Sequence, residues 1–167
     1  MDNDELSRIR SYRYVLYARK STSDEHGEQF RSLKDQVKLC EEMAARLGLN
    51  VVKKIEEDES AKISQYSGGR RHKFYKMIED IENGKYDGIL SYHPDRLSRN
   101  TFDSGKLVDM LDTGKIIDLK FPTTEFRNNA SGKLMLNLMF AMAKEYSEKL
   151  SENVNRGMHG NFEDGKA

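Results

Sequence analysis

The sequence predicts an α/β fold with a mainly parallel sheet of four to five strands, flanked by helices and followed by one long C-terminal helix. Short segments rich in aromatic and β-branched residues alternate with longer segments in which apolar residues recur at steps of three and four. Alternation of strands and helices of these lengths is typical of a parallel sheet covered by helices. The length of 167 residues suits one compact domain with a helical appendage.

The alternating elements can be assigned in chain order. Strands are predicted at residues 12–18, 51–55, 88–92 and 116–121. Helices are predicted where apolar residues keep a helical period and a glycine follows, at residues 33–47, 74–81 and 107–111. Residues 58–70, which include two adjacent glycines, are predicted to form a polar loop, and Pro94 is predicted to lie in a loop after the third strand.

The last third of the chain predicts a single long helix. Residues 131–156 contain no proline and only one glycine, Gly132, which suits a helix of about seven turns. Its first half is apolar around most of its circumference, Met139 and Phe140 included. A small sheet covers only one side of such a helix, so we expect the rest to meet another subunit; the alternative is a loop of the same chain.

The composition excludes several classes of protein. The longest nearly continuous apolar run, residues 134–143, is about half of the ~20 residues that a membrane span needs. The acidic N-terminal residues 1–11 lack the apolar core of a secretion signal, so we expect a cytoplasmic location. The single cysteine, Cys40, excludes a disulfide framework and a cysteine-rich zinc module. Because 28 basic residues balance 28 acidic ones, any attraction to nucleic acid must come from local clusters.

Two segments that follow predicted strands carry serine and arginine. Residues 19–23 follow the first strand, and residues 93–100 follow the third. Because the carboxyl ends of parallel strands meet at one edge of the sheet, both segments should project from that edge. A serine among arginines is what attack on a phosphodiester requires, since guanidinium groups bind the phosphate oxygens and neutralise the charge that develops. Taken singly, such residues are common in loops, and an Asp-Arg pair is usually a surface salt bridge.

Three motifs occur in order along the chain. They are Tyr-Ala-Arg-Lys-Ser-Thr at residues 17–22, Ser-Leu-Lys-Asp-Gln at residues 32–36 and Asp-Arg-Leu-Ser-Arg at residues 95–99. In this order and at this spacing, the motifs resemble the catalytic domain of the serine recombinases, the resolvase and invertase family. The resemblance covers nearly the whole chain. It implies a site-specific DNA recombinase, without metal or cofactor, in which Ser21 forms a covalent phosphoserine bond to a DNA 5′ end and leaves a free 3′ hydroxyl.

The resemblance also assigns the other residues of the site. The catalytic residues that accompany Ser21 are, by this match, Arg19, Gln36, Arg71, Asp95, Arg96 and Arg99. The residues implied to contact DNA are Arg71, Arg96, Arg99 and Arg156. Arg70 is adjacent to Arg71, so that assignment could belong to either residue, and Asp58 resembles an acidic position of the family. We interpret the acidic run at residues 56–59 as a solvated loop rather than a metal site, and the four histidines are far apart in sequence.

This chain departs from the sequence pattern of the family at one pair of residues. Where many members of the family carry Glu-Arg, this chain has Tyr146 and Ser147.

Residues 1–130 are expected to form the catalytic domain, residues 131–157 the helix for oligomerisation and DNA contact, and residues 158–167 the start of a linker to further DNA-binding domains. In the family, dimers on DNA join into a tetramer. We therefore expect the isolated domain to be inactive, with Ser21 and the arginines too far apart to act on one phosphate.

The same residues are compatible with a second function. A non-catalytic dimeric α/β module, in which the arginines only bind phosphate or DNA, is the alternative. Loss of a covalent protein–DNA adduct on replacement of Ser21 would distinguish the two. An acyl hydrolase is disfavoured, because the chain has no Gly-x-Ser-x-Gly motif and no histidine and acid pair placed to activate Ser21.

Overall fold

The computed structural model describes residues 1–20, 32–57 and 71–163, with side chains described up to residue 160. Four strands form one sheet: β1 (Arg13–Arg19), β2 (Asn50–Glu57), β3 (Gly88–Ser91) and β4 (Asp118–Lys120). They lie in the order β2-β1-β3-β4, and all three pairings are parallel. The predicted α/β fold with a parallel sheet is therefore confirmed. Since all four strands run in one direction, β1 and β3 end at the same edge of the sheet.

The described residues form six helices, two of which the sequence patterns did not predict. They are α1 (Asn3–Ser11), α2 (Leu33–Leu47), α3 (His72–Glu82), α4 (Pro94–Leu97), α5 (Thr101–Asp112) and α6 (Ala130–Glu163). Asp2, a residue type that commonly caps helices, is the N-cap of α1. Its carboxylate accepts a hydrogen bond from the Glu5 main-chain nitrogen at 2.7 Å. Helix α4 lies in the expected loop and has Pro94 at its first position.

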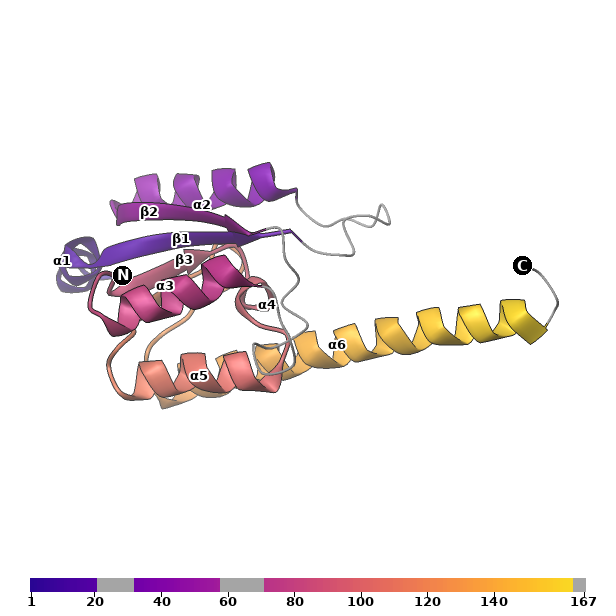
Figure 1. Ribbon diagram of the computed structural model, residues 1–167. Helices are drawn as coiled ribbons and strands as arrows, with labels where there is room; N and C mark the ends of the chain where they lie inside the picture. The colour runs from indigo at the N-terminus through magenta and orange to yellow at the C-terminus, as the bar shows by residue number, and fades with distance from the viewer. Residues whose placement is uncertain (21–31, 58–70, 164–167) are drawn as a thin grey trace.

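The side chains of β1 alternate between the two faces of the sheet. Val15 and Tyr17 pack among residues of α3, α5 and α6 on one face. Tyr14, Leu16 and Ala18 pack against α1 and α2 on the other face. Figure 1 shows the resulting layers, with α2 on one side of the sheet and α3 and α5 on the opposite side. Burial on both faces explains why β1 is a continuous run of apolar and aromatic residues.

Helix α6 is longer than the sequence predicted. It continues past Arg156 to Glu163 and extends well beyond the sheet (Figure 1). The domain boundary expected at residues 157 and 158 therefore falls inside the helix. Residues 158–163, which were expected to begin a linker, are helical.

The apolar first half of α6 is divided between the core of the chain and its surface. Leu136 and Phe140 are 2% and 3% exposed and belong to the core on the α3 and α5 side of the sheet. The expectation that Phe140 meets another subunit is therefore wrong, because α6 packs this face against α4 and α5 of its own chain. A pattern that is apolar all round does not indicate which side faces the core.

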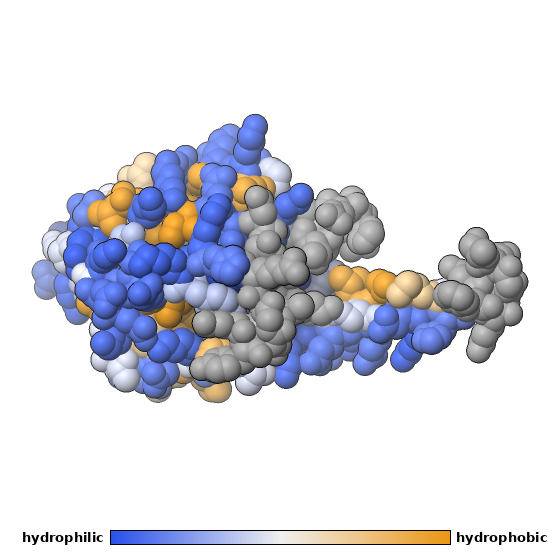
Figure 2. Space-filling view, viewed as in Figure 1, coloured by the Kyte–Doolittle hydropathy of each residue, from blue (hydrophilic) through white to orange (hydrophobic). Residues whose placement is uncertain are grey.

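The opposite side of α6 keeps an exposed apolar stripe. It comprises the exposed residues Leu134, Met135, Leu138, Met142, Tyr146, Val154 and Met158. Figure 2 shows apolar side chains along one edge of the projecting helix and hydrophilic side chains along the other. Within the described residues, no helix has the length and apolar character needed to cross a membrane.

Gly132, near the start of α6, has no room for a side chain. A Cβ atom at this position would lie 1.8 Å from the carbonyl oxygen of Arg127. We expect Gly132→Ala to lower the free energy of unfolding by about 1–3 kcal/mol through overpacking, as measured by urea denaturation. Gly105→Ala in α5 is the matched control, because no atom lies within 4 Å of its Cβ position. The control should keep or raise stability, by up to about 1 kcal/mol; equal losses in both variants would contradict the packing argument.

Candidate active site

Six residues singled out from the sequence meet at the carboxyl edge of the sheet. They are Arg19 at the end of β1, Gln36 in α2, Arg71 just before α3, Asp95 and Arg96 in α4, and Arg99 just after α4. The four arginines are at most 5% exposed. Ser21, the expected nucleophile, lies outside the described residues, as do Asp58 and Arg70.

Arg19 joins the end of β1 to α4. Its Nε donates to the main-chain carbonyl of Arg96 at 3.1 Å, and its Nη2 donates to that of Asp95 at 2.8 Å. In return, the Arg19 carbonyl accepts hydrogen bonds from Arg96 Nη1 at 3.5 Å and Gln36 Nε2 at 3.1 Å. The end of β1 and helix α4 therefore exchange hydrogen bonds, and α2 donates one more to the end of β1.

Arg71 is completely buried and reaches the same point. Its Nη2 donates to the Tyr17 hydroxyl at 3.0 Å and to the Arg96 carbonyl at 3.4 Å. Its Nη1 lies 3.3 Å from Asp103 Oδ2. The guanidinium carbon lies 3.7 Å from the centre of the Phe74 ring, as in a cation–π contact. Arg71 therefore has an ionic partner, an aromatic surface and a link to α4.

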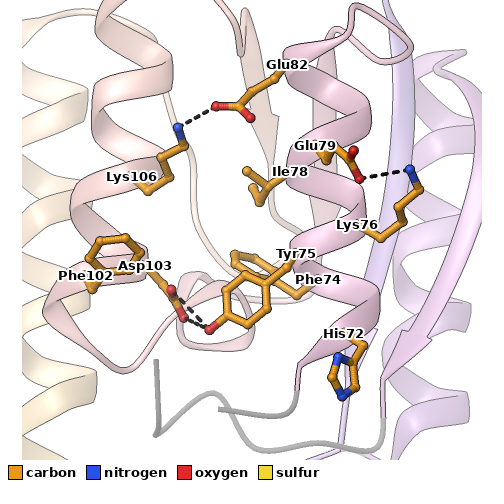
Figure 3. Close-up of a pocket in the computed structure, with 10 residues that line it drawn as sticks. All are labelled: His72, Phe74, Tyr75, Lys76, Ile78, Glu79, Glu82, Phe102, Asp103 and Lys106. Atoms are coloured by element: carbon orange, nitrogen blue, oxygen red, sulfur yellow. Dashed lines mark hydrogen bonds and ion pairs between the residues drawn. The ribbon is translucent and has the colours of Figure 1, made fainter. Parts of the chain in front are cut away.

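Asp103, the ionic partner of Arg71, is itself held by neighbouring side chains. Its Oδ2 accepts from Asn100 Nδ2 at 2.7 Å and from the Tyr75 hydroxyl at 3.2 Å. Figure 3 shows the Tyr75 hydroxyl of α3 pointing at the Asp103 carboxylate of α5, across the groove between the two helices. Asp103 therefore connects Arg71 to both helices.

The Asp95 carboxylate lies among three basic side chains. Its Oδ1 is 3.4 Å from Arg96 Nε and 3.2 Å from His93 Nδ1, and its Oδ2 is 3.8 Å from Arg99 Nη2. Burial alone would raise the pKa of Asp95, but the neighbouring side chains of His93, Arg96 and Arg99 outweigh burial and hold the pKa at about 2. Asp95 is therefore ionised at neutral pH and restrains two arginines.

Among the described residues of this site, two carboxylates, those of Asp95 and Asp103, form ion pairs with three of the arginines. Burial, together with the charges of Arg71, Arg99 and Arg96, lowers the pKa of Arg19 to about 9. The described arginines therefore lie close enough for their like charges to act on one another. The site is therefore suited to an anion with several oxygens, such as a phosphate group.

Glu57 corrects the interpretation of residues 56–59 as a solvated loop. Its side chain is buried at the end of β2, and its Oε2 accepts a hydrogen bond from the Phe74 main-chain nitrogen at 2.8 Å. Its carbonyl accepts from the Lys20 nitrogen at 2.9 Å. Glu57 therefore binds the first turn of α3 and also holds the chain where it leaves β1. In the described part of the chain, no group of three or more His, Cys, Asp or Glu side chains is placed to hold a metal ion.

The residues that hold the arginines were not identified from the sequence. Tyr17 was noted as part of a strand and as the first residue of a motif, but without a role, and Glu57 was noted only as part of an acidic run. Asp103 stands three positions after Asn100, and its main-chain nitrogen donates to Asn100 Oδ1 at 2.8 Å, as in a helix cap. That spacing is a usable signal for the start of α5, but it does not indicate that Asp103 also binds an arginine.

The residues of interest on α6 do not join the arginine cluster. Arg156, an expected DNA contact, is exposed in the projecting part of the helix, 3.8 Å from Glu152. Ser147 is buried, and its hydroxyl has no hydrogen-bond partner among the described residues. Tyr146 borders a cavity whose other walls are partly apolar. The cavity is lined by His93, Asp95, Arg99, Met135, Leu138, Met139, Met142, Ala143 and Tyr146. The apolar face of α6 therefore begins directly beside the Asp95 carboxylate.

The chain resembles known proteins over most of its length. The family model described as Resolvase, N terminal domain, matches residues 14–167. A protein of Bacillus subtilis (strain 168) named "Putative DNA recombinase" is 26% identical over 143 residues. The aligned part makes up 86% of this chain but only 27% of that protein.

Solved structures share the fold. The N-terminal catalytic domain of TP901-1 integrase is 26% identical, with a TM-score of 0.59 over 83% of this chain and 98% of that one. The C-terminal catalytic domain of ISC1926 TnpA, an IS607-like serine recombinase, is 25% identical, with a TM-score of 0.52 over 75% of this chain and 78% of that one. The first ORF in transposon ISC1904 from Sulfolobus solfataricus P2 is similar in fold alone, with 20% identity and a TM-score of 0.51 over 85% and 98% of the two chains.

The buried pair of Arg71 and Asp103 should be important for stability. Asp103→Asn removes the ionic partner of a fully buried guanidinium group, so we expect the free energy of unfolding to fall by about 3–5 kcal/mol in urea denaturation. Glu125→Gln is the matched control, because Glu125 pairs with Arg127 at 2.9 Å on the surface. The control should change stability by less than about 1 kcal/mol. A similarly small loss in Asp103→Asn would show that Asp103 does not hold Arg71.

The low pKa of Asp95 predicts a pH dependence of stability. The pKa is about 2 in the folded chain and 3.8 ordinarily, so the stabilising contribution is complete above about pH 4 and is lost as the pH falls toward 2. Between about pH 4 and pH 2, we expect the free energy of unfolding of Asp95→Asn to fall by about 1–3 kcal/mol less than that of the wild type. The measurement is urea denaturation at a series of pH values. An unchanged pH slope in the variant would mean that Asp95 is not held ionised by its neighbours.

Proposed function

Because the chain belongs to the family of resolvase N-terminal domains, we propose that it is the catalytic domain of a site-specific DNA recombinase with a serine nucleophile. The observation that carries this proposal is the cluster of four buried arginines at the carboxyl edge of the sheet. A phosphodiester presents oxygens that guanidinium groups bind through paired hydrogen bonds. The likeness to the catalytic domain of TP901-1 integrase adds support.

In the proposed reaction, Ser21 Oγ attacks the phosphorus of one DNA phosphodiester. The bond from Oγ to phosphorus forms while the bond from phosphorus to the 3′ oxygen breaks. Ser21 loses its proton, and the 3′ oxygen gains one, so the products are a 5′-phosphoserine link and a free 3′ hydroxyl. The reverse reaction with an exchanged strand rejoins the DNA. Because each step exchanges one phosphate ester for another, the proposed reaction needs no oxidant, reductant or nucleotide energy source. In this proposal the arginines neutralise the developing charge, and no metal or cofactor takes part.

The arginines have distinct tasks in this proposal. Arg96 and Arg99 stabilise the phosphate oxygens as charge develops, and Asp95 keeps both guanidinium groups oriented. Arg19 and Arg71 add positive charge and also hold the main chain of α4 in place. Gln36 donates to the carbonyl of Arg19 and so positions the end of β1 from which the nucleophile segment departs.

The exposed stripe on α6 is the proposed contact between subunits. Leu138, Met142 and Tyr146 lie at steps of four residues and remain exposed, although side chains of this kind are usually covered. A homodimer on DNA, and a tetramer in the synaptic complex, would bury them. The projecting half of α6, including Arg156, would lie against DNA.

Further parts of the protein belong to the same proposal. Residues 1–130 act as the catalytic domain, and α6 leads from it toward a linker and C-terminal DNA-binding domains. Those domains would supply the sequence recognition that a chain of zero net charge does not supply by bulk attraction. We also propose a cytoplasmic location, because the protein would act on cellular DNA.

Replacing the nucleophile tests the reaction directly. We expect Ser21→Ala in the full-length recombinase to abolish the covalent protein–DNA adduct, which is visible as a shifted band on a denaturing gel, while DNA affinity changes little. Ser23→Ala, in the same segment, is the control and should keep the adduct. Adding EDTA should not change the amount of adduct formed by the wild type, because the proposed mechanism uses no metal ion. An adduct that forms normally in Ser21→Ala would instead favour the non-catalytic phosphate-binding module.

The subunit contact is tested on the exposed stripe rather than on Phe140. Leu138 is 53% exposed, so Leu138→Glu should leave the folded chain intact. In a dimer the same charge would be buried, at a cost of several kcal/mol, and sedimentation should show a monomer at concentrations where the wild type associates. Glu152→Gln should be nearly silent in the same measurement. A wild type that stays monomeric at all concentrations would exclude the proposed contact.

A further inference from the structure

His93 stands between the active-site carboxylate and the apolar face of α6. It immediately precedes Pro94, the first residue of α4, and its side chain is 34% exposed. Its Nδ1 accepts a hydrogen bond from the main-chain nitrogen of Asp95 at 3.2 Å. This is a helix-capping role that Ser, Thr, Asp or Asn usually performs. The imidazole therefore fixes the start of the short helix that carries Asp95 and Arg96.

The same nitrogen atom also faces the carboxylate of Asp95. His93 Nδ1 lies 3.2 Å from Asp95 Oδ1. A ring nitrogen either accepts a hydrogen bond through its lone pair or donates one through its proton. In the neutral ring with its proton on Nε2, Nδ1 caps α4 and donates nothing to Oδ1. In the charged ring, Nδ1 donates to Oδ1 and the cap is lost, so protonation selects between two exclusive contacts.

A second cation shares the same carboxylate oxygen. Arg96 Nε lies 3.4 Å from Asp95 Oδ1, slightly farther than His93 Nδ1. A charged His93 attracts Oδ1 away from Arg96, whereas a neutral His93 leaves Oδ1 to Arg96. The protonation state of His93 therefore determines how firmly Asp95 restrains the Arg96 guanidinium.

We propose that His93 is a positioning residue of this site, which adjusts the hold of Asp95 on Arg96 according to its own protonation. The consequence for catalysis rests on the proposed recombinase function, but the link from His93 to Arg96 does not. The charged or titratable groups that face His93 among the described residues are Asp95 and Arg99 beside it and Tyr146 on α6, and the other α6 residues at this cavity are apolar.

The Asp95 carboxylate does not itself change charge between pH 5 and 8, because its pKa is about 2. A transition seen at α4 in this range that disappears in His93→Asn therefore reports on His93.

NMR titration of the ¹⁵N-labelled 167-residue chain tests the proposal. The signals to follow from pH 5 to 8 are the Asp95 main-chain N–H, the Arg96 Nε–H and the His93 ring. We expect all three to shift along one curve in the wild type. His93→Asn keeps a capping side chain but removes the titrating charge, so the Asp95 and Arg96 signals should become independent of pH. His159→Asn, on the projecting end of α6, is the control and should keep the wild-type curves.

Each result decides for or against the proposal. A transition at Arg96 that persists in His93→Asn would assign it to another group and overturn the proposal. A flat Arg96 signal in the wild type, while the His93 ring titrates, would also overturn it, and this comparison needs no variant. Failure of the adduct assay would remove the recombinase function and leave this titration unaffected. In an active full-length protein, we further expect the rate of adduct formation to vary at least threefold over this range in the wild type and to be flat in His93→Asn.

Discussion

The main-chain carbonyl of Arg96 accepts hydrogen bonds from two buried guanidinium groups, those of Arg19 and Arg71. Helix α4 has only four residues, too few to satisfy its own carbonyl groups by helical hydrogen bonds. The two arginines supply those hydrogen bonds and anchor α4 to β1 and α3. Burying charged groups is costly unless they are hydrogen-bonded, and the main-chain acceptors offset that cost. The placement of Asp95 therefore depends on the Arg96 carbonyl and on the carbonyl of Asp95 itself, which accepts a hydrogen bond from Arg19.

The parallel sheet makes this arrangement possible. Because β1 lies between β2 and β3, its end is adjacent to the ends of both neighbours. Arg19 therefore reaches α4, which follows β3, while Glu57 at the end of β2 holds the chain next to it. The same geometry concentrates like charges, and the pKa of Arg19 is lowered as a result. Like charges placed this close together lower the stability of the fold and favour binding of an anion, a common conflict between stability and function.

Local signals made much of the fold predictable from the sequence. Helix α2 begins and ends at the predicted residues, because its apolar residues keep a helical period and Gly48 adopts the left-handed conformation that ends it. The motifs also identified the arginines and Asp95. The partners of Arg71 could not be found in this way, since Tyr17 and Asp103 are distant in sequence and no periodic pattern links them to it. Phe140 was placed on the wrong side of α6 for a related reason: periodicity marks an apolar position but not the surface that covers it.

The projecting half of α6 has a consequence for the thermodynamics of assembly. A helix of 34 residues is about 51 Å long, and its far end lies well beyond the sheet. Val154 and Met158 are exposed there, and Gly157 and Gly160 each lower helix propensity by about 1 kcal/mol. A helix with so little tertiary packing is marginally stable in water. Any partner surface that covers it would therefore also order it, and part of the contact energy would be used to complete the helix. Such an association would be weaker for a given buried area than docking of a preformed surface, and so more readily reversed.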